Sequence, residues 1–386
     1  MDPNAGPDGA TRSARTACTA VDAPSRDYSA QPGWNGREGH PVQWAYIGSF
    51  TSGGGRGITV AAVDAATGAL TPRTSVDAVV NPSCLALAAE TGVLYAVSDT
   101  DPGAVAAFRT GADGSLSALG PAVGVGGSGP THLSVAGSRL FTANYGSGSV
   151  SSFATGPDGS VSGPPIVLAH HGSGPDGERQ RGPHAHQVLP DPGGRWVLSV
   201  DLGTDSVRVC ALDQVTGELR VHTETVLRAG SGPRHLAFHP DGEVVYVLHE
   251  LEPQMTVCRW DPACGRLEPL AEAAIDPEGA PEGEQVYPSV VSVSPDGRFV
   301  RAAVRGSNRI LTFSLADGAE KPQLTSGVDC GGSWPRDLVA DPSGRRLYVV
   351  NEWSRDVTWF DVDAESGQLH RGGALEVPAA ACVVLS

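Results

Sequence analysis

The sequence lacks several features that would indicate common classes of protein. It contains no run of eighteen apolar residues, so we expect no membrane-spanning helix. Positive charge is scarce, and the net charge of −16 argues against a nucleic-acid partner. The seven cysteines include no Cys-x-x-Cys pair, so neither a zinc knot nor a redox dithiol is indicated. We therefore expect a cytoplasmic protein whose cysteines are reduced and mostly buried.

The first 40 residues lack the apolar core of a signal peptide. They are rich in Ala, Gly, Pro, Ser and Asp, a composition typical of flexible segments. We predict that residues 1–40 form a flexible N-terminal tail. Residues 41–386 are predicted to form one domain, which is long enough to bury a large core.

Helical periodicity is also missing, and 50 glycines and 30 prolines exclude helical repeats. Instead, a unit recurs in which a proline precedes a short apolar strand, a glycine turn and a second strand. Clear copies are GPRHLAFHPDGEVVYVLHE (232–250), YPSVVSVSPDGRFVRAAVR (287–305) and WPRDLVADPSGRRLYVVNE (334–352). The opening prolines are Pro82, Pro130, Pro183, Pro233, Pro288, Pro335 and Pro378. Their spacing is about 45–50 residues, in the range of propeller blades.

This period, with four strands per unit, predicts an all-β fold: a seven-bladed β-propeller of four-stranded antiparallel blades. The last unit has one strand, and the segment from Tyr46 to Pro72 has three. The two ends should therefore complete one blade, with the C-terminal strand (381–385) innermost and the N-terminal strands outside it. Radial packing also avoids the open edges of a flat row of sheets.

Polar residues recur where the units begin and where their second strands end. In a propeller the innermost strands line a central channel, so the residues after the opening prolines should be neighbours on a ring. These residues are Ser83, Thr131, His184, Arg234, Ser289, Arg336 and Ala379. His132 lies one place later in its unit, while Glu250 and Arg305 end second strands. His184 and His186 are two residues apart in the segment PHAH, so they would point to the same side of a strand.

Most of these residues also have a structural explanation. A polar side chain in a wet channel can simply be solvated. Arg336 could pair with Glu352 of its own unit as readily as it could contact a substrate, and His235 and His239 are expected to form local hydrogen bonds. The ring offers imidazole and guanidinium rather than the ligand sets of calcium or zinc. We therefore expect no metal and no cofactor.

Five motifs carry a resemblance to a known family. They are YIGSFTSG (46–53), HGSGP…RQ..PHAH (171–186), DLGTDSV (201–207), GPRHLAFHPDG (232–242) and SPDGRF (294–299). Over about residues 45–386 the chain resembles the seven-bladed propeller lactonases of the 6-phosphogluconolactonase type, a family that includes 3-carboxy-cis,cis-muconate cyclases. The resemblance implies a metal-independent site that combines a histidine, arginines and a glutamate. We therefore predict catalytic roles for His184, His186, Arg234 and Glu250, and substrate-binding roles for Arg305, Arg179, Arg336 and His132.

The chain departs from the family pattern at three places. Ser289-Val290-Val291 replaces Ala-Glu-Ile, Val304 replaces an asparagine before Arg305, and Phe50 replaces a tyrosine. The lost glutamate and asparagine would have contacted a polyhydroxylated substrate. A less polar substrate is therefore a credible alternative to a sugar lactone.

Three functions follow from this pattern. A lactonase would hydrolyse an anionic or hydroxylated lactone such as 6-phosphogluconolactone, with a histidine or Glu250 as base and Arg234 stabilising negative charge. A cyclase or isomerase acting on a less polar, carboxylated intermediate of a specialised biosynthetic pathway would use the same residues. A non-catalytic scaffold for a partner protein is the third candidate. A serine nucleophile is not expected, because no GxSxG elbow occurs in a strand–turn–helix context. The favoured partner is a small molecule, and the oligomeric state is undetermined.

Overall fold

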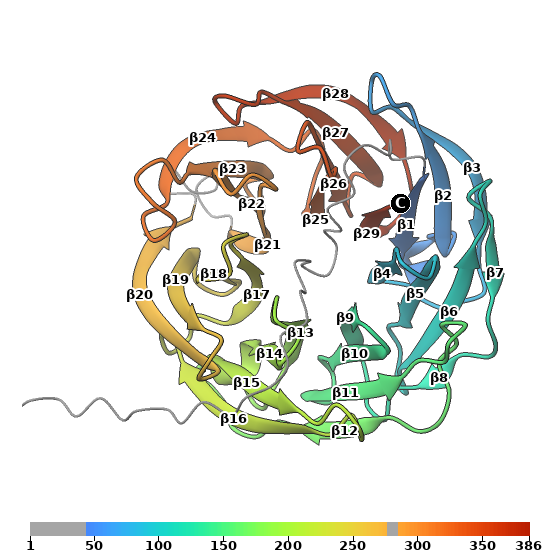
Figure 1. Ribbon diagram of the computed structural model, residues 1–386. Helices are drawn as coiled ribbons and strands as arrows, with labels where there is room; N and C mark the ends of the chain where they lie inside the picture. The colour runs from blue at the N-terminus through green and yellow to red at the C-terminus, as the bar shows by residue number, and fades with distance from the viewer. Residues whose placement is uncertain (1–43, 276–284) are drawn as a thin grey trace, which may run out of the picture.

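The computed structural model describes residues 44–275 and 285–386, and the predicted tail, residues 1–40, lies outside these ranges. Seven antiparallel sheets stand radially around one axis (Figure 1). The predicted seven-bladed all-β fold is thereby confirmed. Within the described ranges, helix is limited to two short 3-10 turns, η1 (Thr51–Gly53) and η2 (Leu202–Thr204), and none is long and apolar enough to cross a membrane.

Each blade runs outward from an innermost strand near the axis to an outermost strand at the rim. The first three blades in chain order are β4 (Leu85–Ala88), β5 (Val93–Ser98), β6 (Ala104–Thr110) and β7 (Leu116–Ala118), with β8 (Val123–Gly124) also paired to β6; β9 (Pro130–Ala136), β10 (Arg139–Asn144), β11 (Ser149–Ala154) and β12 (Ile166–Ala169); and β13 (Ala185–Pro190), β14 (Trp196–Asp201), β15 (Ser206–Leu212) and β16 (Leu219–Val226). The next three are β17 (Pro233–Phe238), β18 (Val244–His249), β19 (Gln254–Asp261) and β20 (Arg266–Ala274); β21 (Tyr287–Val293), β22 (Phe299–Arg305), β23 (Arg309–Ser314) and β24 (Gln323–Asp329); and β25 (Pro335–Ala340), β26 (Arg346–Asn351), β27 (Asp356–Val362) and β28 (Leu369–Glu376). The closing blade is β29 (Ala380–Leu385), β1 (Trp44–Ser49), β2 (Ile58–Val63) and β3 (Leu70–Val76).

The second strand of a blade is buried on both faces, and β18 shows why. Successive side chains of a strand point to opposite faces. Val245 and Val247 pack in a cluster shared with the preceding blade, while Tyr246 and Leu248 pack in a cluster shared with the following blade. All six residues of β18 are buried as a result. Burying apolar surface between blades is what holds the sheets in a ring.

The closing blade joins the two ends of the described chain, as the sequence predicted. β29 is innermost and pairs antiparallel with β1, which is followed by β2 and β3. Gly48 lies opposite Cys382, where a Cβ atom would collide with the carbonyl oxygen of Pro82, so only glycine fits. The N–H of Val383 also donates to Asp337 of β25 at 3.0 Å, which ties the closing strand to the preceding blade.

Candidate active site

The innermost strands of six blades carry a β-bulge at the same point. In one of them Pro233 pairs with His249 and His235 pairs with Leu248, so Arg234 is left out of the ladder. The residues left out in this way are Thr131, His186, Arg234, Ser289, Arg336 and Ala381. A bulge redirects a side chain out of the strand alternation, and such bulges are frequent beside active sites.

Neighbouring bulges contact one another across blades, through the bulged residues themselves or the residue beside them. The guanidinium of Arg234 donates to the carbonyl oxygen of Ser289, and the Ser289 hydroxyl donates to the carbonyl oxygen of Pro335 at 2.7 Å. Thr131 Oγ1 reaches the carbonyl oxygen of His186 at 3.3 Å. The bulges therefore form a ring at the inner edge of the propeller.

Sequence reasoning placed this ring correctly in four blades and two residues too early in two others. His186, not His184, is equivalent to Arg234, and Ala381, not Ala379, occupies the position in the closing blade. The reason is that β13 and β29 begin two residues after their prolines, whereas β17 begins at its proline. Ser83 precedes β4, whose pairing with β5 is regular.

Three arginines meet at Glu250, which directly follows β18. Arg179 Nη2 donates to Glu250 Oε1 at 2.6 Å, and Arg234 Nε and Arg305 Nη2 both lie 2.8 Å from Oε2. We call these four residues the arginine cluster. The side chains of Glu250, Arg234 and Arg305 are less than a tenth exposed, whereas that of Arg179 is 37% exposed. The cluster therefore meets solvent at Arg179.

The arginine cluster has a net positive charge, because three guanidinium groups surround one carboxylate. Burial alone would raise the pKa of Glu250, but Arg305, Arg234 and Arg179 together hold it well below its usual range. Burial and the neighbouring charge of Arg305 lower the pKa of Arg234, and Glu250 opposes that shift. Glu250 is therefore a fixed carboxylate at neutral pH, and the surplus positive charge suits an anionic ligand.

The loop between β12 and β13 brings Arg179 to Glu250. Asp176 Oδ1 accepts the backbone N–H of Arg179 at 2.9 Å, which closes a turn. The next residue, Gln180, is fully buried and donates to the carbonyl oxygen of Leu202 and to Asp205. Anchoring Gln180 in this way fixes the position from which Arg179 reaches across to the neighbouring blade.

Three imidazoles lie beside the arginine cluster. The ring of His235 is 5.3 Å from that of His186 and 5.8 Å from that of His132. Burial and Arg234 lower the pKa of His132 to about 4 and those of His186 and His235 well below 6.5, so all three are neutral at pH 7. Within the described part of the chain, Nδ1 of His132 and of His186 is buried without a hydrogen-bond partner. His235, for which local hydrogen bonding was expected, thus belongs to this group.

His184 occupies a different environment from His186. It precedes β13, and its ring stacks on Tyr145 at 4.4 Å, while His186 meets the same ring at 5.6 Å. Both imidazoles therefore adjoin Tyr145, although the bulge interrupts the alternation that was expected to align them. His184 Nδ1 lies 2.9 Å from the carbonyl oxygen of Tyr145. A carbonyl only accepts, so Nδ1 of His184 carries the proton.

Arg336 and His239 have local partners. Arg336 pairs with Glu352 of its own blade at 3.1 Å, which is one of the two alternatives that the sequence left open, and its guanidinium lies over the ring of Phe50. His239 lies in the turn between β17 and β18 and bonds the carbonyl oxygen of Gly297, in the β21–β22 turn of the next blade, at 2.9 Å. His239 is therefore structural.

Sequence reasoning missed the network around Asp201, which supports the candidate site. Asp201 Oδ2 lies 2.6 Å from His170 and 3.1 Å from Arg208, both buried. Its other oxygen caps η2 and accepts the backbone N–H of His184 at 2.8 Å. The segment DLGTDSV, whose Asp201 ends a second strand, was the available signal. The network fixes the backbone just before the bulge at His186.

No group of three His, Cys, Asp or Glu side chains within residues 44–275 and 285–386 is arranged to hold a metal ion. The histidines at the site adjoin guanidinium groups, which repel cations. Metal independence itself stays a prediction.

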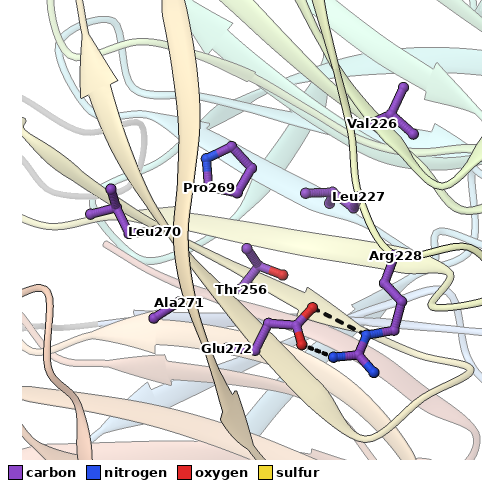
Figure 2. A pocket seen from close by; sticks show the side chains of 8 residues that line it. All are labelled: Val226, Leu227, Arg228, Thr256, Pro269, Leu270, Ala271 and Glu272. Atoms are coloured by element: carbon purple, nitrogen blue, oxygen red, sulfur yellow. Dashed lines mark hydrogen bonds and ion pairs between the residues drawn. The ribbon is translucent and has the colours of Figure 1, made fainter. Parts of the chain in front are cut away.

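A groove of about 350 Å³ lies away from the arginine cluster, between the outermost strands β16 and β20. Figure 2 shows its lining, which includes Leu227, Thr256 and Pro269, and the ion pair of Arg228 with Glu272 at one side. Arg228 Nε donates to Glu272 Oε1 at 3.2 Å. None of the predicted site residues lines this groove.

Comparison with known proteins agrees with the seven-bladed fold. Residues 44–385 match the family model described as "Lactonase, 7-bladed beta-propeller". The chain is 33% identical to the 6-phosphogluconolactonase of Bacillus subtilis over 344 residues, which cover 88% of this chain and 97% of that protein.

Two solved structures support the same assignment. The periplasmic gluconolactonase of Pseudomonas aeruginosa superposes with a TM-score of 0.82 at 28% identity, over 89% of this chain and 99% of that one. A protein from Lactobacillus plantarum superposes equally well, with a TM-score of 0.82 at 27% identity and the same coverage. The chain therefore belongs to the lactonase family of seven-bladed β-propellers.

Proposed function

We propose that this protein hydrolyses an anionic lactone of the 6-phosphogluconolactone type at the arginine cluster. Membership of a lactonase family makes it an enzyme of the hydrolase class. The substrate is proposed to be anionic because three arginines meet at one carboxylate, beside imidazoles that are neutral at pH 7. We also propose that the reaction needs no metal and takes place in the cytoplasm.

The roles of the residues follow from their environments. Arg179, at the solvent side, and Arg305 bind the phosphate or carboxylate of the substrate, as guanidinium groups do through paired hydrogen bonds. Arg234 stabilises the oxyanion that forms when water attacks the lactone carbonyl. His186, with its unpartnered Nδ1, takes the proton from that water. Collapse of the tetrahedral intermediate breaks the ring C–O bond, and the proton passes to the leaving oxygen.

Glu250 is a positioning residue in this scheme, not the base. Its pKa is held well below the usual range by the three guanidinium groups, so it has little affinity for a proton at neutral pH. It instead sets the spacing of the arginines, to which it contributes both carboxylate oxygens.

The direct test is release of acid from 6-phosphogluconolactone, measured above the spontaneous rate. We expect His186→Gln to lower kcat by about 100-fold, the usual contribution of a general base. His184→Gln should have a smaller effect, and the structural residue His239 serves as the control, with unchanged kcat in His239→Gln. If His184→Gln is the more damaging change, the base is His184. If wild-type protein releases no acid from this lactone but converts a carboxylated muconolactone, the cyclase alternative replaces the lactonase.

The pH dependence provides a second test. A base acts only when neutral, so activity falls as the pH decreases through its pKa. Burial and Arg234 lower the pKa of His186 well below 6.5. We therefore expect kcat/KM to stay constant from pH 8 down to roughly the ordinary histidine pKa of 6.5 and to fall only below it. A decline that already begins above pH 7 would contradict the assignment of His186.

A further inference from the structure

Tyr145 occupies the position in its blade that Glu250 occupies in another. Tyr145 directly follows β10, and Glu250 directly follows β18. The N–H of Tyr145 donates to the carbonyl oxygen of Gly129 at 2.9 Å, and the N–H of Glu250 donates to that of Gly232 at 2.7 Å. The same backbone contact therefore places both residues at the end of a second strand, where the arginine cluster lies.

Tyr145 contacts both groups of side chains that make up the candidate site. Its ring stacks on that of His184, with centroids 4.4 Å apart and planes at 21°, and meets the ring of His186 edge-on at 5.6 Å. Its hydroxyl lies 3.4 Å from Nη2 of Arg179, the same nitrogen that donates to Glu250 at 2.6 Å. A substrate that reaches from Arg179 to His186 therefore passes beside Tyr145, since both residues contact it.

The hydroxyl of Tyr145 has a hydrogen to donate. A guanidinium only donates, so the phenol oxygen is the acceptor in its contact with Arg179. In the described part of the chain this hydroxyl makes no other hydrogen bond, and the residue is partly exposed. Three other tyrosines, Tyr95, Tyr246 and Tyr348, donate to backbone carbonyl oxygens instead. The hydrogen of the Tyr145 hydroxyl is therefore available to a ligand.

The chemistry of the lactone places its leaving oxygen in the same region. In 6-phosphogluconolactone the ring oxygen is bonded to the carbonyl carbon and to the carbon next to the one that bears the phosphate. It therefore lies between the phosphate, which Arg179 is proposed to bind, and the carbonyl, which is attacked by the water that His186 activates. Tyr145 contacts both of these residues, so its hydroxyl is a free donor where that oxygen would lie.

We propose that Tyr145 is a further catalytic residue, which donates a proton to the leaving oxygen of the lactone. This inference rests on the proposed function, which takes His186 as the base. As the ring C–O bond of the tetrahedral intermediate breaks, the phenol gives its proton to that oxygen, and the guanidinium of Arg179 stabilises the phenolate. The phenolate then recovers the proton that His186 took from the attacking water. One water is consumed, one hydroxy acid forms, and both side chains are restored.

The test separates the hydroxyl of Tyr145 from its ring. Tyr145→Phe keeps the ring that stacks on His184 and removes only the hydroxyl, whereas Tyr145→Leu removes both. With 6-phosphogluconolactone as substrate, we expect Tyr145→Phe to lower kcat by about 100-fold, as loss of a general acid does, with little change in KM. Tyr145→Leu should lower kcat at least as much. The dissociation constant of the product 6-phosphogluconate, measured by calorimetry, should not change in Tyr145→Phe, because Glu250 still holds Arg179.

Tyr348→Phe is the matched control. It also removes a phenolic hydroxyl, but one that donates to the carbonyl oxygen of Gly68 at the rim, so kcat should be unchanged. Unchanged kcat in Tyr145→Phe would show that only the ring matters and would overturn the role as proton donor. Product binding that weakens as much as kcat falls would also overturn it, because the hydroxyl would then position Arg179. If the wild type releases no acid from this lactone, the proposed function fails, and the role of Tyr145 falls with it.

Discussion

A chain that lacks residues 380–386 is expected to lose its fold. These residues include β29, the innermost strand of the closing blade, and Ala380 to Val383 are all nearly fully buried. Their removal exposes the edge of β1 and takes away the ladder that joins the two ends of the ring. The lost contacts include both hydrogen bonds between Trp44 and Ser386, at 2.9 and 3.0 Å. The free energy of unfolding of a folded protein is only about 5–15 kcal/mol, and the stabilisation lost with a whole inner strand should exceed it.

Thermal unfolding followed by near-ultraviolet circular dichroism measures this effect. We expect no cooperative transition and no native aromatic signal in the shortened chain. The matched control starts at residue 41 and removes a longer segment, the predicted tail; it should melt like the full chain. A chain without residues 380–386 that keeps the native signal and melting temperature would show that the ring closes without its last strand.

Glu250→Gln is expected to lower the free energy of unfolding by about 3–5 kcal/mol, the cost of breaking a buried ion pair. The substitution preserves shape but leaves Arg234 and Arg305 buried beside each other without their shared counter-ion. Activity should be lost as well, because the guanidinium groups would separate. Urea unfolding at pH 7.5 measures the loss of stability, and acid release measures the loss of activity.

Glu352→Gln is the matched control for this effect. Glu352 also pairs with an arginine, Arg336, but both side chains are more than a fifth exposed, so the change should cost less than about 1 kcal/mol. Sulfate should restore more stability to Glu250→Gln than to the wild type, because the anion can replace the missing carboxylate. Equal losses in the two variants would mean that the arginine cluster contributes no more than an exposed pair.

The fold could be predicted from the sequence because its signals are local and repeated. Each proline and each Asp-Gly turn specifies one hairpin, as at Asp241–Gly242, and about 45–50 residues per repeat leave few architectures. The closure could be predicted because the first segment lacks one strand and the last supplies one. These inferences needed no knowledge of which side chains touch.

The site could be predicted only in part, because its geometry depends on register and on distant contacts. Glu250 and Arg305 were recognised as ends of second strands. The residue pattern does not reveal the bulge that places His186, and not His184, on the ring. The contact of Arg179 with Glu250 joins residues 71 positions apart, so the residue pattern does not reveal it. The left-handed backbone of Trp334, with a φ of 65°, is likewise set by partners in space, because its N–H donates to Asn308 Oδ1 at 2.7 Å and its carbonyl oxygen accepts the N–H of Glu352.

The internal carboxylate of the arginine cluster has a consequence for turnover. Opening a lactone creates a new carboxylate, so the product is more negative than the substrate. Three unopposed guanidinium groups would retain such a product and slow its departure. Glu250 already pairs with Arg179 through one carboxylate oxygen and with Arg234 and Arg305 through the other. Any anion that binds these guanidinium groups must therefore compete with Glu250 for them. If the arginine cluster is the anion site, as proposed, this competition lowers the affinity for the substrate and speeds the release of the acid product.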